Sequence, residues 1–125
     1  MIFVDTNVLA YAVGRSHPLQ EPARAFFAES LASEERLVTS AEVLQELLHM
    51  YLPVRRFETL DAALALAEAT IHLVWSLEPE DVRLARLLAD RNPALDARDL
   101  IHLACCHRRN VRRIKTFDRG LAGAF

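Results

Sequence analysis

The chain begins with a short apolar run that ends abruptly in polar residues. Residues 2–4 (Ile-Phe-Val) are followed by residues 5–7 (Asp-Thr-Asn), and apolar residues then return at helical spacing as far as Val13. This order predicts a buried strand, a polar turn and a short helix. A carboxylate that ends the first strand of a parallel sheet lies where open α/β sheets keep their ligand sites. We therefore expect Asp5 to mark the functional edge of the sheet.

Helical and strand-like patterns alternate along the rest of the chain. Apolar spacing predicts helices at 19–32, from Thr39 to the break at Pro53, at 57–69, at 79–90 and at 96–109. It predicts strands at 36–39, at 71–75 and within 111–117. Alternating strands and helices are typical of a parallel sheet with right-handed crossovers. The pattern thus predicts an α/β fold: a three-layer α/β/α sandwich with a mainly parallel four- or five-stranded sheet, in a single domain spanning residues 1–125.

Some local signals sharpen these boundaries. Thr39 and Glu42 have the spacing of a capping box, which predicts that a helix begins after Thr39. Pro79 suits the first turn of a helix. Cys105 and Cys106 are neighbours within a predicted helix, so they point in different directions, and we expect two buried free thiols rather than a disulfide.

Composition narrows the class of protein. Of 125 residues, 52% are hydrophobic and the net charge is −2, which does not by itself indicate a polyanion-binding protein. No stretch approaches the roughly 20 apolar residues of a membrane span. The N-terminus lacks the positive region of a signal peptide and soon reaches Asp5. We expect a cytoplasmic protein with no membrane association.

Four acids are predicted to meet at one edge of the sheet, where the strands end and the following helices begin. They are Asp5, Glu46, Asp99 and Asp118. Each alone has an ordinary interpretation as a helix cap, a solvated helix residue or a turn residue. Clustered carboxylates repel one another, and a divalent cation removes that penalty. A site of acids without histidine or cysteine favours Mg²⁺ or Mn²⁺ over zinc. Of the histidines, His102 is interpreted as a packed or site-edge residue.

Four motifs follow one another along the chain: Asp5-Thr6-Asn7 after a strand, Glu46 in SAEVLQELL, Asp99 in ARDLIHLACC, and Thr116-Phe117-Asp118 after a last strand. In this order they resemble the motifs of the PIN domain, and within that family the chain resembles the small, single-domain VapC-type toxins of toxin–antitoxin pairs. The resemblance covers essentially the whole chain. It implies a Mg²⁺-dependent ribonuclease, usually dimeric and neutralised by a small antitoxin that reaches into the acidic site.

The resemblance also implies roles for individual residues. The family's acidic positions map onto Asp5, Glu46, Asp99 and Asp118, and we expect the first three to hold the metal. The accompanying polar positions are Thr6, Asn7 and Thr116, with Asp96 as a secondary acid. The expected chemistry is metal-assisted phosphodiester hydrolysis.

RNA would need basic residues around this acidic centre. Candidates are Arg15 and the basic segment containing Arg108, Arg109, Arg112 and Arg113, although that segment also suits a solvated helix end. Single-stranded loops are the expected targets. High leucine and alanine content favours a homodimer and a groove for an antitoxin.

Two other classes stay open from the sequence. An aspartyl-phosphate phosphatase usually carries a second aspartate two residues after the first, where this chain has Asn7. A receiver-like phosphoacceptor is matched only loosely, through Lys115. A PIN-like binding module without turnover would keep the packing and lose the chemistry, and the presence of all four acids counts against it.

Overall fold

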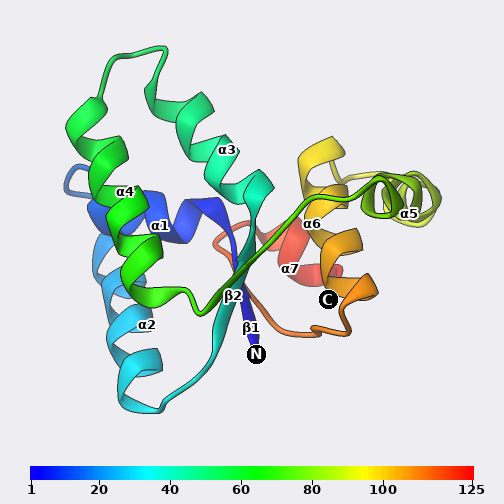
Figure 1. The fold of residues 1–125 in the computed structure, drawn as a ribbon, viewed down its shortest axis with the longest axis horizontal. Coiled ribbons are helices and arrows are strands. Elements are labelled where there is room, and N and C mark those ends of the chain that lie inside the picture. The colour runs from blue at the N-terminus through cyan, green and yellow to red at the C-terminus, as the bar shows by residue number, and fades with distance from the viewer.

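The structure, a computed structural model, describes all residues 1–125 as a four-stranded parallel sheet between two groups of helices (Figure 1). The strand order is β3-β2-β1-β4. In chain order the elements are β1 (Ile2–Val4), α1 (Thr6–Val13), α2 (Gln20–Ala32), β2 (Leu37–Ser40), α3 (Ala41–Tyr51), α4 (Phe57–Thr70), β3 (Leu73–Trp75), α5 (Pro79–Ala89), α6 (Ala97–Arg108), β4 (Ile114–Lys115) and α7 (Arg119–Gly123). The predicted three-layer α/β/α sandwich is confirmed, with four strands.

The first strand occupies the centre of the sheet because both of its faces are apolar. Phe3 pairs in register with Val38 of β2 and with Ile114 of β4. Its ring stacks on Trp75, with centroids 5.9 Å apart, while Val4 is fully buried beside it. Strands buried on both faces are typical of parallel sheets covered by helices.

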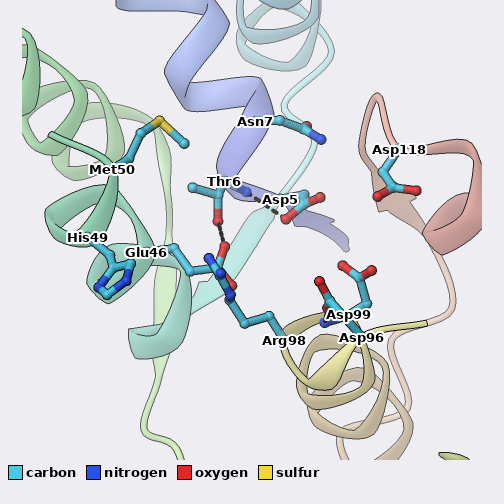
Figure 2. A pocket seen from close by; sticks show the side chains of 10 residues that line it. All are labelled: Asp5, Thr6, Asn7, Glu46, His49, Met50, Asp96, Arg98, Asp99 and Asp118. Atoms are coloured by element: carbon cyan, nitrogen blue, oxygen red, sulfur yellow. Dashed lines mark hydrogen bonds between the residues drawn. The ribbon is translucent and has the colours of Figure 1, made fainter.

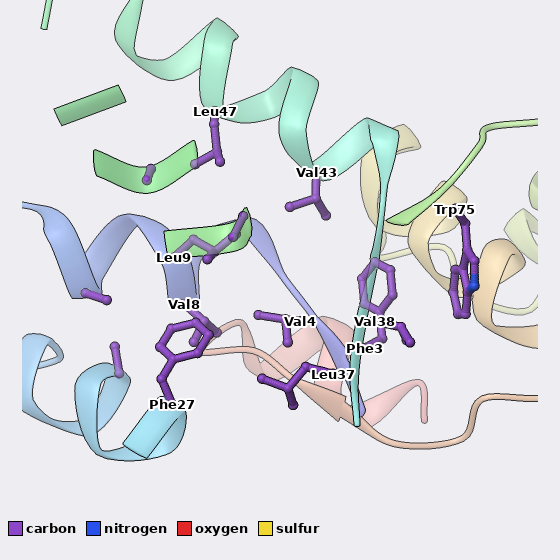
Figure 3. Packing of buried hydrophobic residues seen from close by; sticks show 14 of the residues in the cluster. Phe3, Val4, Val8, Leu9, Phe27, Leu37, Val38, Val43, Leu47 and Trp75 are labelled. Atoms are coloured by element: carbon purple, nitrogen blue, oxygen red, sulfur yellow. The ribbon is translucent and has the colours of Figure 1, made fainter. Parts of the chain in front are cut away.

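Helices α1 to α4 lie on one side of the sheet and α5 to α7 on the other (Figure 1). The main core lies under the first group, where Val8 and Leu9 of α1 meet Val43 and Leu47 of α3 (Figure 3). Cys105 and Cys106 of α6 are buried free thiols, as predicted. No helix is both long enough and apolar enough to cross a membrane.

The predicted capping box at Thr39 is wrong. Thr39 is still part of β2, where its Oγ1 donates a hydrogen bond to the Val4 carbonyl at 2.8 Å. The helix begins one residue later, with Ser40 as its N-cap and no side-chain cap hydrogen bond. Because Thr39 is buried beside β1, its hydroxyl binds the neighbouring strand instead of capping α3. A tertiary contact therefore replaces the local one that the spacing predicted.

Candidate metal-dependent nuclease site

The four predicted acids line one pocket at the carboxyl edge of the sheet (Figure 2). The pocket has a volume of about 390 Å³. Besides these acids its lining comprises Thr6, Asn7, His49, Met50, Asp96 and Arg98. Four segments that are far apart in sequence meet there because parallel strands bring all their carboxyl ends to one edge.

Asp5 is fixed by two hydrogen bonds and is almost fully buried. Its Oδ1 accepts from the Thr6 amide at 2.8 Å, which makes Asp5 the N-cap of α1. Its Oδ2 accepts from the Thr116 hydroxyl at 2.7 Å. Asn7 completes this link by donating to Thr116 Oγ1 at 3.2 Å and accepting from the Phe117 amide at 3.2 Å. The end of β1 and the end of β4 are therefore tied together around one carboxylate.

Glu46 reaches the pocket from the second turn of α3 and is buried there. Its Oε2 accepts a hydrogen bond from the Thr6 hydroxyl (Figure 2), and its Oε1 lies 2.9 Å from His102 Nε2. The same nitrogen lies 3.7 Å from Asp5 Oδ1. Ligand atoms of Asp5, Glu46 and His102 all lie within 4.8 Å of one another.

His102 is buried in the core and also lies beside the acids of the pocket. The interpretation as a packed or edge residue holds for its burial, since it is 1% exposed and its ring lies 5.4 Å from that of Phe3. The structure also places His102 Nε2 beside the carboxylates of Asp5 and Glu46, a contact that the sequence did not predict. His102 follows Asp99 by three positions on α6, so the same helix face carries both into the site. Its Nδ1 is buried without a partner, so Nε2 alone anchors the ring.

Asp96, Asp99 and Asp118 form the outer, more open side of the pocket (Figure 2). Asp96 is the N-cap of α6 and accepts from the Asp99 amide at 2.9 Å. Asp118 is the N-cap of α7 and accepts from the Leu121 amide at 3.1 Å. Capping orients both carboxylates, while the Asp99 carboxylate caps nothing and faces the pocket. Arg98, which the sequence analysis missed, is the one arginine in the lining.

The pKa shifts show a site with more negative charge than the protein neutralises. Burial raises the pKa of Asp99 to about 6, with further contributions from the charges of Asp96, Asp118 and Asp5. Burial also raises the pKa of Asp5, despite hydrogen bonds that favour its ionised form. Such carboxylates are held together at a cost that a bound cation would remove.

Glu46 and His102 behave as a matched pair within this site. Burial opposes ionisation of Glu46, but its hydrogen bonds with His102 and Thr6 prevail and lower its pKa. Burial likewise opposes charging of His102, but the adjacent carboxylates raise its pKa. We interpret His102 as a donor that orients Glu46 rather than as a ligand, since its Nε2 already faces Glu46 Oε1.

The donor set fits a hard divalent cation. Buried carboxylate oxygens of Asp5 and Glu46 face the open side where Asp99 lies, and oxygen ligands of this kind suit Mg²⁺ or Mn²⁺. The predicted polar residues Thr6, Asn7 and Thr116 all hold these carboxylates or one another. The arrangement can therefore hold a divalent metal ion.

The predicted basic segment does not surround this pocket. Arg108 and Arg109 both bind the buried Asp81 of α5, at 2.7 and 2.8 Å. Arg112 and Arg113 precede β4 and so lie at the amino edge of the sheet, opposite the acids. None of these four arginines lines the acid pocket, whereas Arg15 lines a pocket beside it.

Comparison with known proteins gives a consistent result. A family model described as "PIN domain" matches residues 2–124. Ribonuclease VapC23 of Mycobacterium tuberculosis is 61% identical over 125 residues, covering 100% of this chain and 98% of that protein. Ribonuclease VapC13 of the same species is 39% identical over 120 residues, covering 96% and 92%.

Two solved structures share the fold. The crystal structure of M. tuberculosis VapC20, described as a sarcin-ricin loop cleaving toxin, superposes with a TM-score of 0.81 at 20% identity, covering 99% of this chain and 95% of that one. Rickettsia felis VapBC2, bound to a DNA fragment from its promoter, superposes with a TM-score of 0.66 at 15% identity, covering 94% and 100%.

Proposed function

Because this chain belongs to the PIN-domain family and is a VapC-type ribonuclease, we propose that it hydrolyses RNA at the acid pocket with Asp5, Glu46 and Asp99 holding Mg²⁺ or Mn²⁺. The protein acts as the toxin of a toxin–antitoxin pair, in one nuclease domain. The observation that carries the assignment of the site is the convergence of four acids, from four separate segments, on one pocket.

When bound, a divalent cation would supply positive charge to stabilise the scissile phosphate and would lower the pKa of a water molecule. The protein's own residues hold and orient this site. Thr116 and the Thr6 amide fix both oxygens of Asp5, and His102 and the Thr6 hydroxyl fix both oxygens of Glu46. Asp99 faces the same pocket, and its raised pKa makes it sensitive to a nearby cation.

Asp118 is proposed to act at the rim. Its carboxylate lines the pocket and caps α7, and its amide donates to Thr116 Oγ1 at 3.0 Å. It can therefore accept a hydrogen bond from the attacking water or complete the ligand set, while Asp96 supports Asp99 by capping the same helix.

The phosphatase alternative loses support at Asn7. A second aspartate there would serve as acid or base, whereas the Asn7 amide is bound to Thr116 and to the Phe117 backbone. The binding-module alternative predicts packing without turnover, and only an activity assay separates it from the nuclease.

The decisive experiment is cleavage of total RNA by purified protein, followed by mapping of new RNA ends. We expect metal-dependent cleavage by the wild type, loss in Asp99→Asn, and retention in the control Asp61→Asn, whose exposed carboxylate lies on α4. Cleavage that persists in Asp99→Asn or in the presence of a chelator would overturn the assignment of the site.

The partners follow from the family. We propose a cognate antitoxin that inserts into the acid pocket, a homodimer and a cytoplasmic location. Solvent-exposed apolar side chains such as Leu73 and Val74 on the edge strand β3 and Leu87 on α5 provide surface for assembly. Size-exclusion chromatography with light scattering tests the dimer, and a strict monomer at micromolar concentration would exclude it.

A further inference from the structure

A second pocket adjoins the acid pocket and shares Asn7 and Met50 with it; Figure 2 shows both side chains from the acid-pocket side. Its volume is about 360 Å³, within the range of pockets that bind small organic groups. It lies between α1, the turn that follows it, and the end of α3. The lining contains two arginines, Arg15 and Arg56, and no carboxylate, in contrast to the acid pocket.

A row of aromatic rings begins beside Asn7, which both pockets share, and leads into this second pocket, which Tyr11 and His17 line. The Phe117 amide is bound to Asn7, and the Phe117 ring meets Tyr11 edge-on at a centroid distance of 5.7 Å. His17 continues the row, with its ring 4.6 Å from that of Tyr11 and tilted by 32°. His17 is exposed, so the row ends in a ring accessible from solvent.

The turn that carries His17 is held in one conformation. His17 Nδ1 accepts a hydrogen bond from the Leu19 amide at 3.0 Å, which fixes the ring. Gln20 Nε2 donates to the Gly14 carbonyl at 2.9 Å. A Cβ at Gly14 would lie 2.9 Å from the Ala10 carbonyl oxygen, so this close approach requires glycine. A fixed ring loses little conformational entropy when a ligand stacks on it.

The two arginines of this pocket carry unneutralised charge. Neither forms a salt bridge, whereas Arg108, Arg109 and Arg113 all do. The Arg56 guanidinium lies 5.5 Å from the Tyr51 ring centroid and donates to Thr59 Oγ1 at 3.2 Å. Its position is therefore set by neutral groups, and its charge stays available to an anion.

We propose that this second pocket binds a flanking nucleotide of single-stranded RNA, with its base stacked on His17 and its phosphate near Arg15 and Arg56. Aromatic faces beside cations are the combination by which proteins bind single strands. Unpaired bases are the ones free to stack in this way. The inference rests on the proposed function, since the shared residues Asn7 and Met50 would place this nucleotide next to the scissile bond.

The test uses binding, so that cleavage and its unknown target sequence do not enter. Full-length protein carrying Asp5→Asn is titrated against two fluorescent single strands of roughly ten nucleotides, within the site sizes known for such proteins. One strand carries bases, and the other is abasic with the same number of phosphates. We expect the base-containing strand to bind about 5- to 10-fold more tightly, which is the lower end of the range for stacking of one base.

Two substitutions separate the ring from the turn. His17→Asn removes the aromatic face and keeps an acceptor for the Leu19 amide, in the manner of an Asx turn, so the preference for bases should disappear. His17→Phe keeps the face, so the preference should persist. His107→Asn, at an exposed histidine on α6, is the matched control and should bind as the parent does.

Salt dependence tests the phosphate contact independently. Arg15→Ala should reduce the slope of log affinity against log salt by about 0.7, the value for one phosphate of a single strand. Arg91→Ala, an exposed arginine after α5, is the control and should leave the slope unchanged.

Failure of this inference is distinguishable from failure of the proposed function. If the wild type cleaves RNA but His17→Asn retains the base preference, the second pocket is not a nucleotide site and the nuclease assignment stands. If the wild type does not cleave but His17→Asn abolishes the preference, the second pocket is a nucleotide site and the nuclease assignment falls. If the pocket binds a protein segment instead, His17→Asn should change the affinity for both strands by the same factor. That result would overturn the inference.

Discussion

Two sites treat their carboxylates in opposite ways: Asp81 on α5 is paired with arginines, whereas the acids of the pocket at the carboxyl edge of the sheet are not. Asp81 of α5 is 0% exposed and is bound by Arg108 and Arg109. Burial opposes its ionisation, but the arginine hydrogen bonds prevail and lower its pKa to about 2. Asp99, in the acid pocket, has its pKa raised to about 6 by burial and by neighbouring acids.

The difference separates a carboxylate whose charge is neutralised by arginines from one whose charge is not. Arg109 also packs over the Trp75 ring, at 4.9 Å from its centroid, so the Asp81 cluster joins α5, α6 and β3 with its charge satisfied. The acid pocket leaves its charge unsatisfied, which is a cost to the folded protein and an affinity for a cation. Substitutions in the acid pocket should therefore lower activity and spare stability, whereas substitution of Asp81 should lower stability and spare activity.

The largest expected effect is on catalysis in the acid pocket. Asp5→Asn should lower RNA cleavage by about 10³-fold, which corresponds to about 4 kcal/mol of transition-state stabilisation. Folding should survive, because the amide oxygen can still accept from the Thr6 amide and cap α1, and the hydrogen bond lost is the one from Thr116 to the second oxygen. Single-turnover cleavage and circular dichroism measure the two properties. A variant that is unfolded, or one that still cleaves RNA, would contradict the expected difference between the acid pocket and Asp81.

The second largest effect is on stability at Asp81. Asp81→Asn leaves two arginines facing a neutral side chain and should lower the free energy of unfolding by about 3 kcal/mol, the lower end for a broken buried ion pair, since both arginines are partly exposed. Urea unfolding measures this loss. Cleavage by the remaining folded protein should stay close to wild type, and Asp90→Asn, at an exposed acid of the same region, is the control.

A third, smaller effect concerns how the acid pocket is organised. His102→Ala removes the donor that orients Glu46, and loss of such a supporting group typically weakens metal affinity about 10- to 100-fold. Activity plotted against Mg²⁺ concentration should shift to higher metal and approach wild-type kcat at saturation. His102→Gln, which can still donate to Glu46, should recover part of the affinity. An unchanged metal titration would remove His102 from the site.

The smallest effects are on stability as a function of pH, and they have opposite signs in the two places. Asp99 has a folded pKa of about 6, above the usual value of 3.8, so its ionisation weakens the fold as pH rises through that interval. In chelator, Asp99→Asn should therefore raise Tm at pH 7.5 and leave it nearly unchanged at pH 4. Added Mg²⁺ should stabilise the wild type and reduce this difference.

Asp81 gives the opposite pH dependence. Its folded pKa of about 2 lies below the usual 3.8, so its contribution is complete above pH 4 and is lost as pH falls toward 2. The Tm difference between the wild type and Asp81→Asn should shrink over that range. A difference that stays constant down to pH 2 would show that packing, rather than charge, makes Asp81 important.

The sequence by itself determined the alternation of strands and helices and, through it, the edge at which Asp5, Glu46, Asp99 and Asp118 meet. These features could be predicted because hydrophobic periodicity is local, and because parallel strands necessarily bring their carboxyl ends together. The residues at which helices begin were harder to predict from the sequence. Thr39 had the spacing of a cap, yet its hydroxyl binds the neighbouring strand.

Only the tertiary structure decided which charges are neutralised. Arg108 and Arg109 are separated from Asp81 by more than 25 positions, and His102 is separated from Glu46 by 56. Pairings of this kind depend on how α5, α6 and α3 pack around the sheet, and no local pattern records them. The same packing placed the aromatic row beside the acids. Composition supplies the charged groups, but the low-dielectric contacts that give each one its role exist only once the chain is folded.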